Sequence, residues 1–120
     1  MSEFLDAYIE CALWSSTNMD TEKPLDDDYG VGDIADEALT RMAIECEDFQ
    51  QLAEPVLAEA YQQPGYGPAQ AGHDFWLTRN RHGAGFWDRG LGETGEKLTQ
   101  MAKWAGPVDL YVGDDGKVYQ

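Results

Sequence analysis

Basic residues are scarce in this chain of 120 residues. Eight lysines and arginines face 23 aspartates and glutamates, so the formal net charge at pH 7 is -15. A field of this sign repels nucleic acid and anionic membranes, and it attracts the basic surfaces of other proteins. The composition therefore argues against direct binding to nucleic acid or membranes and favours a basic protein as the partner.

Long apolar runs and cysteines are also few. No apolar run approaches the ~18 residues that span a bilayer, and the N-terminus lacks the basic and then apolar layout of a signal peptide. The two cysteines, Cys11 and Cys46, fall at apolar helical positions, where buried reduced thiols are commoner than a disulfide or a metal pair. We therefore expect a soluble cytoplasmic protein without a metal site or cofactor.

The negative charge is concentrated in the first half of the chain. Residues 1–63 carry 16 acidic residues against Lys23 and Arg41, a net charge of -14, whereas residues 64–120 carry seven against six, a net charge of -1. With 42 % hydrophobic residues, the chain is large enough for one core but not for two. We expect a single domain over 1–120, with an acidic helical part at 1–63 and a second part at 70–120.

Apolar spacing predicts helices in the acidic part. Residues Glu3 to Ser15 repeat apolar side chains every three or four positions, and Ser2 suits the N-cap of such a helix. A longer stripe runs from Asp33, a candidate N-cap, to Ala60, with a kink or break expected near Pro55. Between these helices, Ser15 to Asp33 has the composition of a long loop.

That loop contains a short acidic run, Asp26 to Gly32, which resembles a calcium loop at first sight. Glu37 falls at the twelfth position of the EF-hand spacing, but Gly30 and Val31 occupy positions that require a ligand and a glycine. The run is therefore interpreted as a solvated acidic turn that precedes a helix.

The polar side of the long helical region is a candidate binding surface. Its acidic residues are Asp36, Glu37, Glu45, Glu47, Asp48, Glu54 and Glu59. One interpretation is a solvated face with Glu37–Arg41 and Arg41–Glu45 pairs, each worth only ~0.2–0.5 kcal/mol. The other is a charged surface that imitates the phosphate backbone and captures a DNA-binding protein.

The second part is expected to be built from hairpins. After a Pro/Gly-rich linker at Gln62 to Gly72, aromatic runs at Phe75 to Arg79 and Phe86 to Asp88 flank a turn-like segment and predict a β-hairpin over Gly72 to Gly90. A helix at about Thr94 to Ala105 and a second hairpin formed by 108–112 and 117–120 follow. The fold class is thus α+β, with three or four helices packed on a small antiparallel sheet of two hairpins.

The first hairpin gathers the side chains best suited to recognition or catalysis. The candidates are His73, Asp74, Trp76, Arg79, Asn80, Arg81, His82, Trp87, Asp88 and Arg89. His82 or His73 could pair with Asp88, but no Ser/His/Asp arrangement is evident, so no catalytic residue is assigned. Burial of the aromatic rings in the core, and ion pairs from the arginines to the acidic helices or, for Arg89, to a carboxylate in the core, are the structural alternatives.

A glycine-rich motif follows this hairpin. Residues Gly90 to Gly95 fit GxGxxG and precede a predicted helix, and Asp114 lies about 20 residues further on, as in a dinucleotide site. Only 25 residues remain after Gly95, too few to complete a parallel sheet. A glycine-rich connection is therefore favoured over a nucleotide site.

Three blocks carry a resemblance to known proteins: GHDFWLTRN at 72–80, HGAGFWDRG at 82–90 and VDLYVGDDG at 108–116. Together they span most of residues 70–119, and the chain thereby resembles a group of small, acidic, uncharacterised proteins encoded by tailed bacteriophages. The chain departs from the group at Arg81, where glycine is expected after Asn80. The resemblance implies a phage origin and the host bacterial cytoplasm, and no activity.

Two hypotheses follow. In the first, the protein is a phage-encoded interaction module whose acidic helical face binds a basic host or phage protein, either as a DNA mimic or as an inhibitor of a defence enzyme. In the second, the Gly72 to Gly90 hairpin is a small-ligand or catalytic site. Arg79 and Arg81 hold an anion, His73 or His82 transfers a proton, and Trp76 or Trp87 stacks on the ligand.

Overall fold

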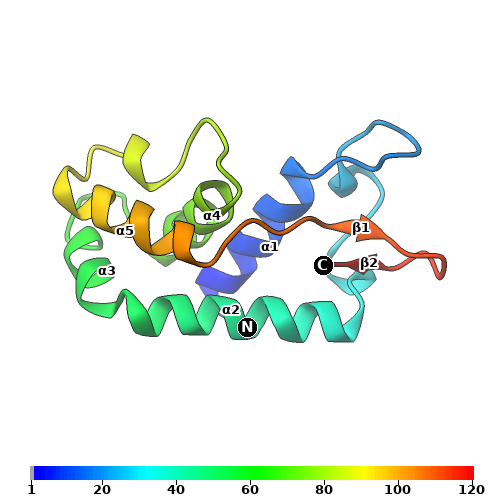
Figure 1. The fold of residues 1–120 in the computed structure, drawn as a ribbon, viewed down its shortest axis with the longest axis horizontal. Helices are drawn as coiled ribbons and strands as arrows, with labels where there is room; N and C mark the ends of the chain where they lie inside the picture. The colour runs from blue at the N-terminus through cyan, green and yellow to red at the C-terminus, as the bar shows by residue number, and fades with distance from the viewer. Residues whose placement is uncertain (1) are drawn as a thin grey trace.

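The protein is mainly helical. A computed structural model describes residues 2–120 and contains five α-helices, three short 3-10 turns and one two-stranded sheet. The helices are α1 (Glu3–Ser15), α2 (Asp36–Leu52), α3 (Glu54–Ala60), α4 (Pro68–Arg79) and α5 (Glu93–Trp104), and the strands are β1 (Tyr111–Val112) and β2 (Val118–Tyr119). Figure 1 shows α2 along one side of the molecule, with α3 at one end and the β1–β2 hairpin near the other. Within residues 2–120, no helix is both long and apolar enough to cross a membrane.

Helix α1 packs most extensively against α4, and Gly72 permits their close approach. A Cβ atom at Gly72 would overlap the backbone carbonyl of Phe4 on α1. The absence of a side chain therefore lets the two backbones meet directly, as small residues do wherever helices cross closely.

Aromatic rings fill the centre of the core. The rings of Phe49 from α2 and Phe75 from α4 stack with centroids 4.1 Å apart, and Phe4, Tyr8 and Phe86 pack around this pair. Stacked aromatic pairs add ~0.5–1.5 kcal/mol beyond the burial of their surface. The buried side chains of both halves of the chain form one continuous core.

The helices predicted for the acidic part are present. The first spans Glu3–Ser15 as expected, and the Ser2 hydroxyl caps it by accepting a hydrogen bond from the Leu5 amide at 3.1 Å. The long helical region breaks after Leu52, and Pro55 takes a place in the first turn of α3, where its missing N–H costs little. The predicted N-cap is wrong: α2 follows Ala35, while Asp33 accepts a hydrogen bond from the Gly30 amide.

The predicted hairpin over Gly72 to Gly90 is wrong. Residues Pro68–Arg79 form α4, and Phe86–Asp88 form only a 3-10 turn, so the sheet contains one hairpin rather than two. Helix α4 is buried on nearly all sides from Ala71 to Arg79, and such a helix has no polar face to reveal its period. A short continuous apolar run does not distinguish a buried helix from a strand.

Arg81, where the chain departs from the expected glycine, lies at the C-terminal end of α4. This residue adopts a left-handed backbone with φ of 57°. Its amide donates to the Thr78 carbonyl, and the His82 amide donates to the Leu77 carbonyl, the two hydrogen bonds of a Schellman cap. Arg81 thus occupies the capping position that usually requires glycine, and the segment after Asn80 ends a helix instead of joining two strands.

The rest of the second part agrees more closely with expectation. Helix α5 covers the region predicted to be helical, and the terminal hairpin pairs Tyr111 with Tyr119 and Val112 with Val118. The GxGxxG motif joins a 3-10 turn to α5, and no parallel sheet accompanies it in residues 2–120. It is a glycine-rich connection without the βαβ setting of a dinucleotide site.

The helix crossing at Gly72 gives a stability prediction. Gly72→Ala should lower the free energy of unfolding by about 2 kcal/mol or more, because the added methyl group meets backbone that cannot rotate away. Urea denaturation followed by circular dichroism would measure the change. Gly83→Ala is the matched control, since its Cβ meets open space, and it should stay within about 0.5 kcal/mol of the parent. Equal stability of the two variants would contradict this account of the crossing.

Candidate functional site

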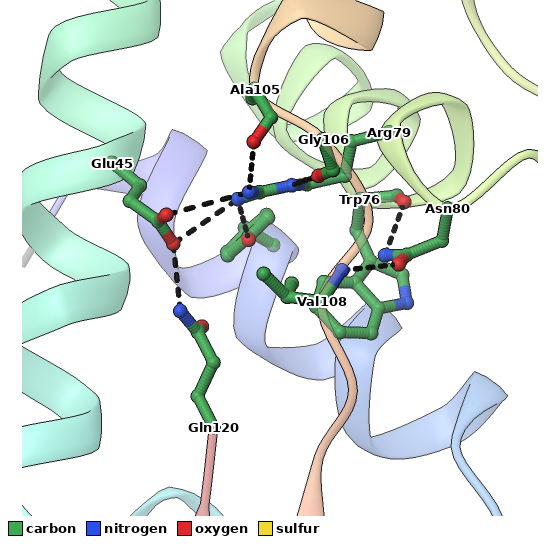
Figure 2. Close-up of polar contacts among 9 residues, drawn as sticks. Glu45, Trp76, Arg79, Asn80, Ala105, Gly106, Val108 and Gln120 are labelled. Carbon is green, nitrogen blue, oxygen red and sulfur yellow. Dashed lines mark hydrogen bonds and ion pairs between the residues drawn. The ribbon is translucent and has the colours of Figure 1, made fainter.

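Arg79, a candidate for anion binding, lies in the protein interior and is 1 % exposed. Its Nε donates to the Gly106 carbonyl at 2.8 Å, and Nη2 donates to the Ala105 carbonyl at 3.0 Å. The remaining contacts are to the Tyr8 hydroxyl and to both carboxylate oxygens of Glu45 (Figure 2). Five N–H donors thus meet five protein acceptors, so the guanidinium retains no donor for a ligand.

The ion pair between Arg79 and Glu45 is a structural element. The shortest distance between them is 3.2 Å, and Gln120 donates to the same carboxylate at 2.8 Å. Burial alone would lower the pKa of Arg79, but the neighbouring Tyr8 and Glu45 raise it above its ordinary value. This confirms the alternative in which an arginine of this segment pairs with an acidic helix.

Asp74 and Arg89 form a second interior ion pair. The Asp74 side chain is fully buried, and Arg89 Nη2 lies 2.8 Å from its Oδ1. Tyr66 and Gln70 donate further hydrogen bonds to the same carboxylate. The hydrogen bonds from Arg89 to Asp74 raise the pKa of Arg89. The prediction of a core carboxylate for Arg89 is confirmed, and the Asp74 carboxylate accepts hydrogen bonds from Arg89, Tyr66 and Gln70.

Two further candidates hold α4 in place. Trp76 is buried, and its indole Nε1 donates to the Ser15 hydroxyl at 2.6 Å. Asn80 donates to the Trp76 carbonyl and accepts a hydrogen bond from the Val108 amide at 2.9 Å (Figure 2). These side chains join α4 to α1 and to the segment before β1.

The other candidates of this segment do not converge. Arg81, His82, Trp87 and Asp88 are exposed, and no hydrogen bond or ion pair joins either histidine to Asp88 in residues 2–120. His73 is half-buried on α4, and its Nδ1 is buried without a hydrogen-bond partner in the described chain. The structure therefore does not assemble the proton-transfer pairs considered from the sequence.

Six of the seven acidic-face candidates are exposed, and we call them the acidic surface. They are Asp36, Glu37, Glu47, Asp48, Glu54 and Glu59. Glu45 is the exception, because it turns toward Arg79. The predicted Glu37–Arg41 and Arg41–Glu45 pairs do not form, since the ion pairs within residues 2–120 are those of Arg79 and Arg89. The acidic surface thus has no cationic partner in the described chain.

A small apolar groove lies beside the acidic surface, between α2 and α5. It has a volume of about 260 Å³, and its lining includes Asp48, Leu52, Met101 and Trp104. Leu52 is 53 % exposed and Trp104 is 71 % exposed. The sequence alone did not mark Leu52 or Trp104 as functional, although Trp104 falls outside the buried stripe of α5.

The cysteines are structural. Cys11 and Cys46 are free and buried, as expected for reduced thiols in a core. Burial raises the pKa of the Cys11 thiol to about 12, and burial likewise raises the pKa of Cys46. Thiols with such pKa values are poor nucleophiles. No cluster of three metal-ligating side chains occurs in the part of the chain from residue 2 onward.

The Arg79 network gives the second prediction. Arg79→Met should lower the free energy of unfolding by about 3 kcal/mol, because it leaves Glu45 without its cation and strands the Tyr8 hydroxyl and two carbonyls. Chemical denaturation would measure it. Arg81→Met removes the same charge from an exposed position and should cost well under about 1 kcal/mol. Similar losses in both variants would show that the network contributes little.

His73 gives a pH prediction. Burial lowers its pKa, and although Asp74 and Glu10 oppose this effect, Arg89 adds to it. The unfolded chain therefore binds a proton more readily than the folded protein, so stability is retained above the ordinary histidine pKa of about 6.5 and is lost as pH falls below it. Between pH 7 and 5, the parent should lose more stability than His73→Gln. Parallel pH profiles of the two proteins would contradict the shift.

Comparison with known proteins assigns no family to this geometry. No protein-family model, curated protein or solved structure matches the chain. Inferences about function therefore depend on the charges, burial and surface shape of the molecule itself.

Proposed function

We propose that the chain is a phage-encoded protein-interaction module that acts in the host bacterial cytoplasm. Its acidic surface on α2 and α3 binds a basic host or phage protein. The observation that carries this proposal is the exposure of six carboxylates without a cationic partner within residues 2–120. Because like charges on a surface repel one another, a basic partner relieves a cost that the free protein carries.

The two ion-paired arginines do not offset this charge. Arg79 and Arg89, two of the eight basic residues, pair with Glu45 and Asp74. They neutralise those two carboxylates rather than the acidic surface. Arg41 is the sole basic residue on α2, so the field outside this helix stays negative, which speeds the association of basic proteins.

The neighbouring groove favours a protein over a simple counterion. Leu52 and Trp104 expose apolar surface beside Asp48. Protein interfaces commonly place buried aromatic anchors within a polar rim, whereas a solvated ion gains nothing from an apolar wall. Charge would then steer the partner, and the groove would supply contact area.

Charge density distinguishes two versions of this proposal. Duplex DNA carries about one charge per 1.7 Å of its axis. Helix α2 has 17 residues, a length of about 25 Å, and only five acidic residues offset by Arg41. A basic partner bound by complementary charge is therefore favoured over close imitation of a DNA backbone by α2 alone.

The alternative of an anion-binding site is not favoured, because the arginines best placed to bind an anion already contact protein groups. Every donor of Arg79 contacts a protein acceptor, and Arg89 is held by Asp74. Arg81 and His82 remain exposed on one loop, without further side chains that converge on a common ligand.

Affinity capture from infected bacterial lysate tests the proposal. The tagged protein should retain a basic protein at low salt and release it at high salt, since exposed charges are screened over about 10 Å at 0.1 M ionic strength. Binding of the purified partner should weaken at least about tenfold when four carboxylates of the acidic surface are neutralised. The variant combines Asp36→Asn, Glu37→Gln, Glu47→Gln and Asp48→Asn.

A control with the same net charge separates the acidic surface from overall charge. It neutralises four exposed carboxylates elsewhere, through Glu93→Gln, Glu96→Gln, Asp109→Asn and Asp114→Asn. This control should change the affinity by no more than about threefold, because it leaves the local field at α2 in place. Equal weakening in the two variants, or capture that salt does not disturb, would refute the proposed surface.

A further inference from the structure

A second concave surface lies away from the α2–α5 groove. It is a groove of about 800 Å³ between α1, the 3-10 turns at Leu25–Asp27 and Val31–Asp33, and His73 of α4. Its lining includes carboxylates from Asp6, Glu10 and Asp26 and apolar surface from Trp14, Tyr29 and Val31. We call it the α1 groove. In Figure 1 the loop that forms one wall passes beside the C-terminal end of α1.

The charge of the α1 groove has one sign. Asp6, Glu10 and Asp26 are exposed, and none of them forms an ion pair within residues 2–120. The lining contains no lysine or arginine. Its single histidine, His73, has a pKa that burial lowers, so this side chain adds no positive charge at neutral pH. The groove is therefore complementary to a cation.

The aromatic wall indicates which kind of cation fits. Trp14, near the C-terminal end of α1, is 59 % exposed. Its ring centre lies 6.3 Å from that of His73, and both side chains line the α1 groove. A guanidinium stacks on such a ring while it donates to carboxylates, whereas an ammonium is more strongly hydrated and lacks a planar face.

We propose that the α1 groove binds an arginine-bearing extended segment of the basic partner, an inference that rests on the proposed function. The guanidinium stacks on Trp14 and pairs with the carboxylates of Asp6, Glu10 or Asp26. The volume of about 800 Å³ lies within the range of pockets that enclose most of a ligand, ~300–1,000 Å³, and it exceeds the needs of a single guanidinium. The apolar side chains of Tyr29 and Val31 contact the rest of the segment.

Peptide titration of the full-length protein, observed by ¹⁵N NMR, tests the inference without the natural partner. The probe is acetyl-Gly-Arg-Gly-Arg-Gly-amide, and the control peptide replaces both arginines with citrulline, which has nearly the same shape but no charge. The arginine peptide should shift the signals of Glu10, the Trp14 indole, Tyr29 and Val31. The citrulline peptide should bind at least about tenfold more weakly, because it forms no ion pair with the groove.

Two tryptophan variants locate the site. Trp14→Ala should weaken binding of the arginine peptide about two- to fivefold, since stacking of a cation on an exposed ring is worth ~0.5–1 kcal/mol. Trp104→Ala removes an even more exposed ring, from the α2–α5 groove, and should leave the affinity unchanged. Absence of binding, equal binding of the citrulline peptide, or signal shifts centred on α2 would overturn the inference.

These outcomes are separate from those of the affinity capture. If the peptide binds the α1 groove but lysate yields no basic partner, the proposed function fails while the arginine site stands. If a partner binds through α2 and its affinity is unaffected by Trp14→Ala, the proposed function stands and the α1 groove is not part of that interface.

Discussion

The buried guanidinium of Arg79 is the interaction on which the arrangement of the helices depends. It contacts Tyr8 on α1, Glu45 on α2 and the two carbonyls at the end of α5, while its own backbone belongs to α4. Removing a charge from water costs several kcal/mol unless geometry and hydrogen bonding offset it. Five contacts from three other parts of the chain meet that condition, and together they restrict how those parts can be placed around α4 (Figure 2).

The same interaction decides which way α2 faces. Once Glu45 turns toward Arg79, Phe49 one turn later points into the aromatic core, and Glu47 and Asp48 point outward. The acidic surface is therefore a consequence of the core as well as of composition. Because each of these two arginines is paired with one carboxylate, the pairs are neutral, and the remaining six basic residues are still outnumbered by 21 acidic ones.

Sequence periodicity was sufficient for helices with one buried face. Helices α1 and α5 and the break near Pro55 were predicted because apolar residues recur every three to four positions and proline has a fixed effect on the backbone. Helix α4 was missed because burial on nearly all sides removes that period. Its one local signal, Gly67 followed by Pro68 at the start of the helix, was instead assigned to a linker.

The residues of the candidate site were likewise only partly predictable from the sequence. The exposure of the acidic surface was predictable from charge, and so was the tendency of Arg89 to find a core carboxylate. The inward orientation of Glu45 was not predictable, since its partner, Arg79, is 34 residues away in the chain. The α1 groove joins α1, a loop and α4, and no local pattern brings His73 to Trp14. Such juxtapositions arise from tertiary packing alone.

The distribution of tryptophan provides the molecule with a set of optical probes. Trp76 is 2 % exposed, whereas Trp14, Trp87 and Trp104 are each more than half exposed. The three exposed rings line three different hollows of the surface. Each of these three hollows therefore contains its own fluorophore, and versions of the protein that retain one exposed ring would report the occupancy of each of them separately.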